Sequence, residues 1–203
     1  MVEDWRSLEV TVPASLIRIA DGTTQLFETV HAAHRKLAAC ANVLRILGRG
    51  GATSADDVRE APSARAFLGD ARRELARLLE LHDAASHVFD IYSTLLPLDL
   101  EDEPRWRRWD GHSGDTRRRA YQALRGLRSA TSHLLASRNA LLMARSCPHL
   151  SADWTAWMSA ALHLARCAMW ESTMAMASTR QMSDAVALEL DDAWMIVFLI
   201  DSL

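Results

Sequence analysis

Apolar side chains recur at alternating spacings of three and four residues through most of this chain, a pattern typical of amphipathic α-helices. The clearest face follows Pro62 and carries Leu68, Ala71, Leu75, Leu78, His82, Ala85, Phe89, Tyr92 and Leu96. A later face alternates small with large residues: Ala120, Ala123, Leu127, Ala130, Leu134, Ser137, Leu141 and Ala144. Because small residues at facing positions let two helix backbones approach, we expect close packing along this second face.

Breaker residues divide the pattern into helices. An irregular lead at 1–22 precedes a first helix, which Thr23 or Thr24 is suited to cap and which Gly48 ends. The second helix has a proline in its first turn and ends before Pro97, because proline lacks the amide that a helix interior needs.

The second half of the chain follows the same logic. A polar loop is expected at 97–114, and Asp115 is a suitable cap for a third helix that Pro148 terminates. Ser151 is then expected to cap a fourth helix, and 183–201 to form a fifth.

These elements predict an all-α fold, an up-down-up-down bundle of four long helices with an additional apolar C-terminal helix. Residues 1–203 are expected to form a single helical-bundle domain. Within it, 183–203 is predicted to pack on the bundle or on a dimer partner, because Trp194–Ile200 is too apolar for a solvated surface.

Composition narrows the class of protein further. No apolar stretch reaches the roughly 18 residues that a membrane span requires, and Met1–Arg6 lacks the features of a secretory signal, so no membrane partner and a cytoplasmic location are predicted. The three cysteines form no CxxC pair and are expected to be buried, reduced thiols.

Several histidines fall on or near the predicted helix seams. Antiparallel stacking of the four helices places His34, Leu78, His133 and His163 at one height along the bundle. About one turn away, the same construction gathers Glu28, His31, His82, Arg128 and Cys167. A layer of imidazoles in a bundle interior predicts either a hydrogen-bonded structural network or a reactive site.

A metal centre is one interpretation of this layer. Glu28 and His31 have the i, i+3 spacing that puts a carboxylate and an imidazole on one helix face, and helical bundles build metal sites from such inward-facing ligands. The predicted ligand set is Glu28, His31, His34 and His82, with Fe, Mn or Zn as the metal. The second Glu-x-x-His of a ferritin-like dinuclear site is missing. The competing interpretation makes His34 and His82 core histidines with hydrogen-bond partners, while His31 and His87 face solvent.

The segment Arg128-Ser-Ala-Thr-Ser-His133 resembles the Arg-x4-His active-site motif of HEPN-domain ribonucleases, which are also small all-α proteins. The resemblance covers six residues and implies metal-independent RNA cleavage, with Arg128 stabilising phosphate charge and His133 acting at the scissile bond, usually across a dimer. Ser129 replaces the polar amide that usually follows the arginine.

Charge is distributed unevenly along the chain. Residues 103–128 contain eight arginines, whereas 171–203 contains six acids and a single arginine. The Arg/Trp-rich loop at 104–109 offers cations and aromatic rings to a nucleic acid. The favoured alternative is that its tryptophans cap the end of the bundle while its arginines pair with the acidic C-terminal segment or with the acids that precede the loop, Asp99, Glu101, Asp102 and Glu103.

The leading hypothesis is a protein that binds or transforms a small, partly apolar molecule in a His-lined bundle interior, next to a Met- and Trp-rich fourth helix. If it is an enzyme, a metal-dependent oxidase or hydrolase is the expected type, with catalytic groups drawn from His82, His133, His163 and Arg128. Cys167 is a lesser candidate. The alternatives are a non-enzymatic homodimeric interaction module and the HEPN-like ribonuclease.

Overall fold

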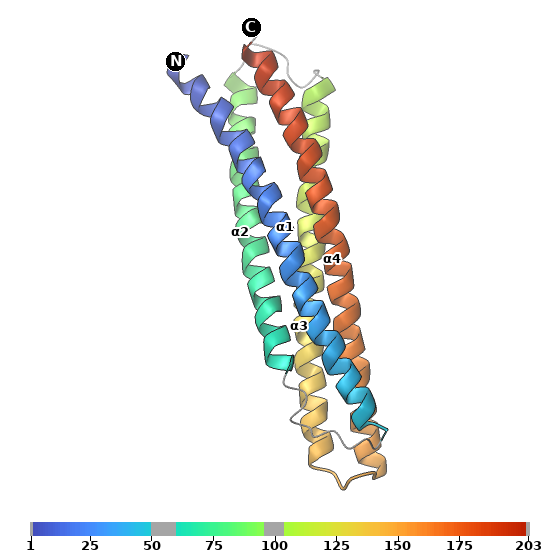
Figure 1. Cartoon of the computed structure of the whole chain (residues 1–203). Helices are drawn as coiled ribbons and strands as arrows, with labels where there is room; N and C mark the ends of the chain where they lie inside the picture. The colour runs from blue at the N-terminus through green and yellow to red at the C-terminus, as the bar shows by residue number, and fades with distance from the viewer. Residues whose placement is uncertain (1, 50–59, 96–103, 202–203) are drawn as a thin grey trace. The chain divides into compact units, whose positions relative to one another are not determined.

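A computed structural model describes residues 2–49, 60–95 and 104–201, and all the regular secondary structure in these ranges is α-helical. The helices are α1 (Val2–Leu47), α2 (Glu60–Leu95), α3 (Pro104–Arg145) and α4 (Ala152–Asp201), drawn in Figure 1. No strand occurs among the described residues. The prediction of an all-α helical bundle is therefore confirmed.

Helix α1 begins earlier than predicted, so most of the supposed lead at 1–22 is helical. Gly22 does not end a helix. A Cβ atom at this position would lie 2.5 Å from a δ-methyl carbon of Leu78, so the glycine allows α1 to approach α2 closely. Thr23 is not an N-cap either, because its hydroxyl donates a hydrogen bond of 2.7 Å to the carbonyl oxygen of Ala20 within the same helix.

Helix α3 also begins earlier than predicted. The expected loop at 97–114 is helical from Pro104 onward, and 97–103 lies outside the described residues. Trp109 is buried with 2% of its surface exposed, and its ring centroid lies 4.5 Å from that of Phe89 and 5.2 Å from that of Trp106. This aromatic cluster holds the first turns of α3 against α2.

Helix α4 is a single helix of 50 residues, so 183–201 does not form a separate fifth helix. No glycine or proline lies between Ala152 and Asp201, and the helix continues because nothing in its sequence breaks it. Its start agrees with the prediction, since the Trp154 amide donates to the Ser151 hydroxyl over 3.1 Å.

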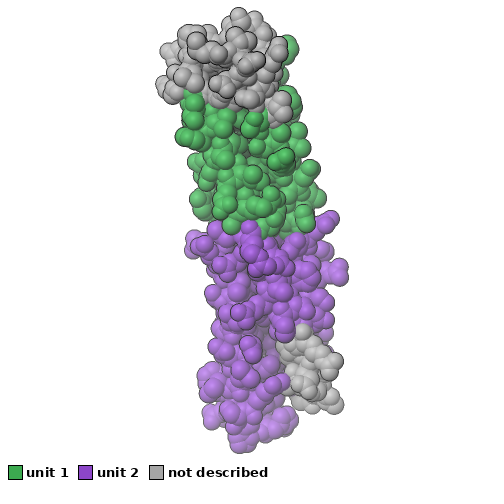
Figure 2. All heavy atoms as spheres, turned by 90° about the vertical axis from the view of Figure 1, so that its left-hand side faces the viewer, with its two compact units in different colours: residues 1–26, 74–122, 178–203 green, residues 27–73, 123–177 purple. Residues whose placement is uncertain are grey.

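The chain divides into two compact units, coloured separately in Figure 2. Unit 1 comprises 1–26, 74–122 and 178–203, and unit 2 comprises 27–73 and 123–177. Each unit takes one segment from each of the four helices.

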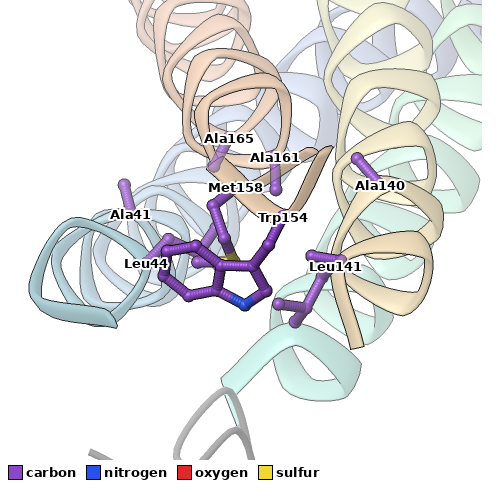
Figure 3. Close-up of a cluster of buried hydrophobic side chains, with 9 residues drawn as sticks. Ala41, Leu44, Ala140, Leu141, Trp154, Met158, Ala161 and Ala165 are labelled. Atoms are coloured by element: carbon purple, nitrogen blue, oxygen red, sulfur yellow. The ribbon is translucent and has the colours of Figure 1, made fainter. Parts of the chain in front are cut away.

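The core of unit 2 is built from small and large apolar residues. One cluster at its centre consists of Ala41, Leu44, Ala140, Leu141, Ala144, Trp154, Met158, Ala161 and Ala165. Figure 3 shows the indole ring of Trp154 lying between Leu44 and Leu141. The small-and-large face predicted for the third helix is interior, because all eight of its residues, from Ala120 to Ala144, are buried.

None of the described helices combines the length and apolarity needed to cross a membrane.

Candidate functional site

A cavity of about 830 Å³ opens into unit 2 between α1, α2 and α3. Cys40 and Leu44 line it from α1, while the first turns of α2 and the last turns of α3 form the other walls. This volume is in the range of pockets that hold small organic ligands. Helix α4 contributes no residue to the described lining, but the lining residues Leu44 and Leu141 pack in one cluster with Trp154 and Met158 of that helix.

The inner surface of this cavity is mainly apolar. Leu44, Leu134 and Leu141 are buried lining residues, and two of them, Leu44 and Leu141, also belong to the cluster around Trp154. The one buried hydroxyl of the lining, on Ser137, donates a hydrogen bond of 2.7 Å to the carbonyl oxygen of Ala161. The deep part of the cavity is therefore suited to apolar groups.

Gly69 helps to leave this space open. It lies in the middle of α2, and a Cβ atom added there would meet only the Arg73 guanidinium, at 3.8 Å. Apart from the neighbouring backbone of α2 itself, no other atom lies within 4 Å of that position. A larger side chain at Gly69 would therefore extend toward the cavity without disturbing the packing of α2.

The outer part of the cavity is lined by arginines. Five of them contribute to it: Arg65, Arg72, Arg73, Arg138 and Arg145. Asp70 is the single acidic side chain of the described lining, and it forms an ion pair with Arg73. The cavity thus combines an apolar interior with a cationic edge.

The thiol of Cys40 is the only described lining group with the chemistry of a nucleophile other than a hydroxyl, and its environment suppresses that chemistry. Burial, and secondarily the negative charge of Glu60, raises the pKa of this thiol from 9.0 to about 11. At neutral pH it is protonated and weakly nucleophilic. The cavity therefore has the features of a binding site more than those of a covalent catalyst.

Unit 1 holds a different kind of cluster, a buried polar network around His82. The Nε2 atom of His82 lies 3.0 and 3.1 Å from the two carboxylate oxygens of Glu189. Thr116 donates its hydroxyl to Glu189 over 3.0 Å, and the Ser113 hydroxyl lies 3.4 Å from Nε2 and 3.2 Å from the Ser86 hydroxyl. Because a carboxylate accepts hydrogen bonds only, an ionised Glu189 requires the proton on Nε2.

This network is closed to solvent. His82 has 0% of its surface exposed and Glu189 has 1%. The remaining ring nitrogen, Nδ1 of His82, is buried without a hydrogen-bond partner among the described residues. Such a geometry favours a structural role, in which the network fixes how α2, α3 and α4 pack within unit 1.

A second polar group in unit 1 joins the buried Asp192 to the more exposed His112 and Arg108. Asp192 accepts a hydrogen bond from Nδ1 of His112 over 2.8 Å, and it lies 3.5 Å from the Arg108 guanidinium. Asp192 belongs to the acidic C-terminal segment, so this contact supports the sequence interpretation in which arginines of 104–109 pair with that segment.

The residues predicted as metal ligands have separate surroundings. Glu28 and His31 are exposed on α1, and the His31 ring stacks on Phe27 with centroids 6.4 Å apart. His34 is half-buried, and its Nδ1 atom lies 2.9 Å from the hydroxyl of Ser172. Among the described residues, no group of three or more His, Cys, Asp or Glu side chains has the arrangement to hold a metal ion. The alternative prediction, that His31 and His87 face solvent, is confirmed.

The remaining candidates lie in unit 2, away from the cavity lining. His163 is exposed on α4, and its Nε2 atom lies 3.6 Å from the sulfur of Cys167. On α3, Arg128 is exposed and His133 is half-buried. None of these four side chains is among the described residues that line the cavity.

Sequence reasoning missed two features that carry recognisable signals. Glu189 lies on the buried stripe of α4 that contains Met182, Val186, Ala193 and Ile196, and a charged residue on such a stripe requires a buried partner. The cavity arginines occur as pairs seven residues apart, Arg65 with Arg72 and Arg138 with Arg145. That spacing puts each pair on one helix face. Which helix faces would meet was not evident from the pattern.

Neither the protein-family models nor the curated proteins compared with this chain match it.

Proposed function

We propose that this protein binds a small, partly apolar molecule in the cavity of unit 2. The observation that carries the proposal is the cavity itself, about 830 Å³ with an apolar interior that is continuous with a well-packed core cluster. The cavity is open to solvent, and an apolar ligand would release water from its leucine-lined surface on binding.

Gly69 offers a test that changes the cavity with little effect on the fold. Gly69→Leu adds a side chain toward the cavity, whereas Gly69→Ala adds one methyl group where only Arg73 lies within 4 Å. The neutral fluorescent probe N-phenyl-1-naphthylamine is expected to bind the wild-type protein and Gly69→Ala with similar affinity. Its affinity for Gly69→Leu is expected to fall about tenfold or more, as roughly 1.4 kcal/mol of lost contact energy would produce.

Gly69→Leu and Gly69→Ala together also define the result that would contradict the proposal. Both substitutions are expected to raise helix stability, since glycine in a helix interior costs about 1 kcal/mol relative to alanine. Equal probe binding by wild type and Gly69→Leu, with both proteins fully folded by circular dichroism, would exclude the cavity as the binding site.

The enzymatic form of this proposal is a metal-dependent oxidase or hydrolase that uses Fe, Mn or Zn. Elemental analysis of protein purified without an affinity tag or chelator tests it, together with His34→Ala and His82→Ala variants. Near-stoichiometric metal that both substitutions remove would support the enzyme. Metal content that neither substitution changes would rule out the predicted ligand set.

Exposed apolar residues on α4 support a second candidate function, a homodimeric interaction module. In unit 2, Trp170 and Met174 are 65% and 47% exposed, and in unit 1, Phe198 is 69% exposed. Large apolar side chains at such exposure are typical of protein-protein contacts. Sedimentation velocity of the wild type and Trp170→Ser distinguishes the candidates, because an interaction module predicts a dimer that the substitution weakens.

Two other parts of the hypothesis belong to the same proposal. We take the helices to be connected in an up-down-up-down order and the protein to act in the cytoplasm. The HEPN-like alternative requires Arg128 and His133 to act together, so RNA cleavage lost in both Arg128→Ala and His133→Ala would favour it over ligand binding.

A further inference from the structure

The arginines of the cavity carry more positive charge than their surroundings neutralise. Of the five that line it, Arg73 is paired with Asp70. The other four, Arg65, Arg72, Arg138 and Arg145, form neither a hydrogen bond nor an ion pair with any described residue. The chain as a whole has a net charge of −3, so this cluster of positive charge is opposite in sign to the protein overall.

The acidic residue at the start of α2 does not supply the missing charge. Glu60, at the start of α2, forms an ion pair of 2.8 Å with Lys36. Among the described lining residues, Asp70 is therefore the only acid that offsets the positive charge of the arginines. An anion from solution would find four guanidinium groups available.

Arg72 has the most restricted environment of the four. Its Nε atom is buried and has no hydrogen-bond partner among the described residues. A buried N–H donor is normally satisfied, and an unsatisfied one is unfavourable because it has lost its hydrogen bonds to water. This atom is closed to solvent, so a ligand would instead meet the outer part of the half-buried Arg72 side chain, which lines the cavity.

The apolar side of the cavity adds a second requirement. Leu44, Leu134 and Leu141 provide buried aliphatic surface next to the arginines, which suits a hydrocarbon group better than a fully hydrated ion. An inorganic anion would satisfy the charge and leave this surface unused. An apolar neutral molecule would fill the surface and leave the charge unpaired.

We propose that the cavity of unit 2 binds an amphipathic anion, with a hydrocarbon chain against its leucines and a carboxylate or phosphate head group on Arg72 and Arg138. This inference rests on the proposed function and specifies its class of ligand. Guanidinium groups bind both kinds of head group through paired hydrogen bonds. Arg65 and Arg145 add electrostatic attraction at the cavity mouth.

Four probes with the same alkyl chain separate charge from apolarity: dodecanoate, dodecyl phosphate, dodecanol and dodecyltrimethylammonium, each used below its micelle concentration. Isothermal titration calorimetry is expected to show dodecanoate or dodecyl phosphate binding at least tenfold more tightly than dodecanol, with the cationic probe weakest. The preference should shrink as salt is added, because salt screens the charges. Which of the two anions binds more tightly identifies the head group.

Substitutions at the arginines locate the interaction. Arg72→Gln and Arg138→Gln are each expected to weaken binding of the preferred anion about tenfold, which is the effect of losing one charge-assisted hydrogen bond. Both should leave binding of dodecanol unchanged. Arg125→Gln is the matched control, because this exposed arginine is in the same helix and unit as Arg138 but does not line the cavity.

The possible outcomes distinguish this inference from the proposal beneath it. Equal affinity for dodecanol and the anions would overturn the anionic ligand while leaving the apolar binding site in place. Binding of inorganic phosphate as tightly as dodecyl phosphate would overturn the amphipathic ligand. Loss of anion binding in Arg125→Gln equal to that in Arg138→Gln would assign the preference to general charge. No binding of any alkyl probe, together with no binding of N-phenyl-1-naphthylamine, would reject both proposals.

Discussion

The two units of this protein use the same four helices but fill their interiors in different ways. At the centre of unit 1, a buried histidine, a carboxylate and three hydroxyl groups join α2, α3 and α4. At the centre of unit 2, alanines pack against Leu44, Trp154 and Met158, and an apolar cavity adjoins them. The polar interior is closed, whereas the apolar interior has an opening edged by cations.

Under the proposed function, this difference corresponds to a division of roles. A buried hydrogen-bonded network allows few alternative packings, because each displaced partner leaves an unsatisfied polar group. An apolar interior tolerates a change in what fills it, since dispersion contacts have no fixed direction. Unit 1 is therefore suited to specify the helix arrangement, and unit 2 is suited to exchange a ligand.

The largest expected effect comes from breaking the network of unit 1. His82→Leu leaves the Glu189 carboxylate, 1% exposed, with only the Thr116 hydroxyl as a partner. Removing one member of a buried charged pair costs about 3–5 kcal/mol, and a loss of this size is expected in the free energy of unfolding. Urea denaturation followed by circular dichroism measures it.

The double variant His82→Leu/Glu189→Met is the control for this prediction. Replacing both partners by apolar residues removes the buried charge as well, and it is often neutral or stabilising. The double variant should thus recover most of the stability lost in His82→Leu. A double variant as unstable as the single one would show that the shape of His82, and not its pairing with Glu189, stabilises unit 1.

An intermediate effect is expected from the close helix contact in unit 2. A Cβ atom at Gly126 of α3 would lie 3.1 Å from the carbonyl oxygen of Glu171 and 3.2 Å from the Cβ of Ala175, both on α4. Gly126→Ala must therefore push these helices apart, at a cost of about 1–3 kcal/mol. Thermal denaturation should show a lower melting temperature than that of Gly69→Ala, where the same methyl group meets no such obstacle.

The two glycines are expected to give opposite changes in stability when the same methyl group is added. Gly69→Ala is expected to stabilise the protein and Gly126→Ala to destabilise it, although both glycines are interior to a helix. If the two variants changed stability equally, helix propensity would outweigh tertiary packing in this unit.

The effect at Cys40 is absent at neutral pH and appears only at alkaline pH. The folded protein raises the pKa of this thiol from 9.0 to about 11, so it holds the proton more firmly than the unfolded chain does. The stability of the folded state is unaffected below pH 9.0 and declines between pH 9.0 and about 11, with a slope of about 1.4 kcal/mol per pH unit from this group.

Replacing the thiol tests this dependence. Between pH 9.0 and about 11, the free energy of unfolding of Cys40→Ala should decline less steeply than that of the wild type. The remaining decline comes from the other titrating groups. At neutral pH, a maleimide reagent should label the half-exposed Cys147 and Cys167 and leave Cys40 unmodified. Rapid labelling of Cys40 in the folded protein would contradict the buried, protonated thiol.

Much of the helical framework could be predicted from hydrophobic spacing, because periodicity depends on local sequence. The buried face of α2 agrees with the pattern from Leu68 to Phe89, and so does the start of α4 after Ser151. The errors arose at Gly22 and at the segment from Pro104 to Gly114. There, residues that usually break a helix are held in helical form by neighbours such as Leu78 and Phe89.

The candidate sites were less predictable than the framework. His82 was expected in the interior from its place on the stripe of α2, but its partner Glu189 is 107 positions away in sequence. No local pattern connects two residues so far apart. The cavity arginines were unpredictable for the same reason. Each helix carries a pair spaced seven residues apart, Arg65 with Arg72 on α2 and Arg138 with Arg145 on α3. Only the packing of the two helices brings both pairs to one cavity.

Residue type and local spacing were enough to predict that this chain is helical, where most of its buried faces lie and that its thiols lack a paired CxxC motif. Only the tertiary structure shows that α1, α3 and α4 are each continuous, which residue pairs with His82 and where the cavity lies. Each of these depends on contacts between residues distant in the chain, whose free energy outweighs local preferences at glycines, prolines and buried charges.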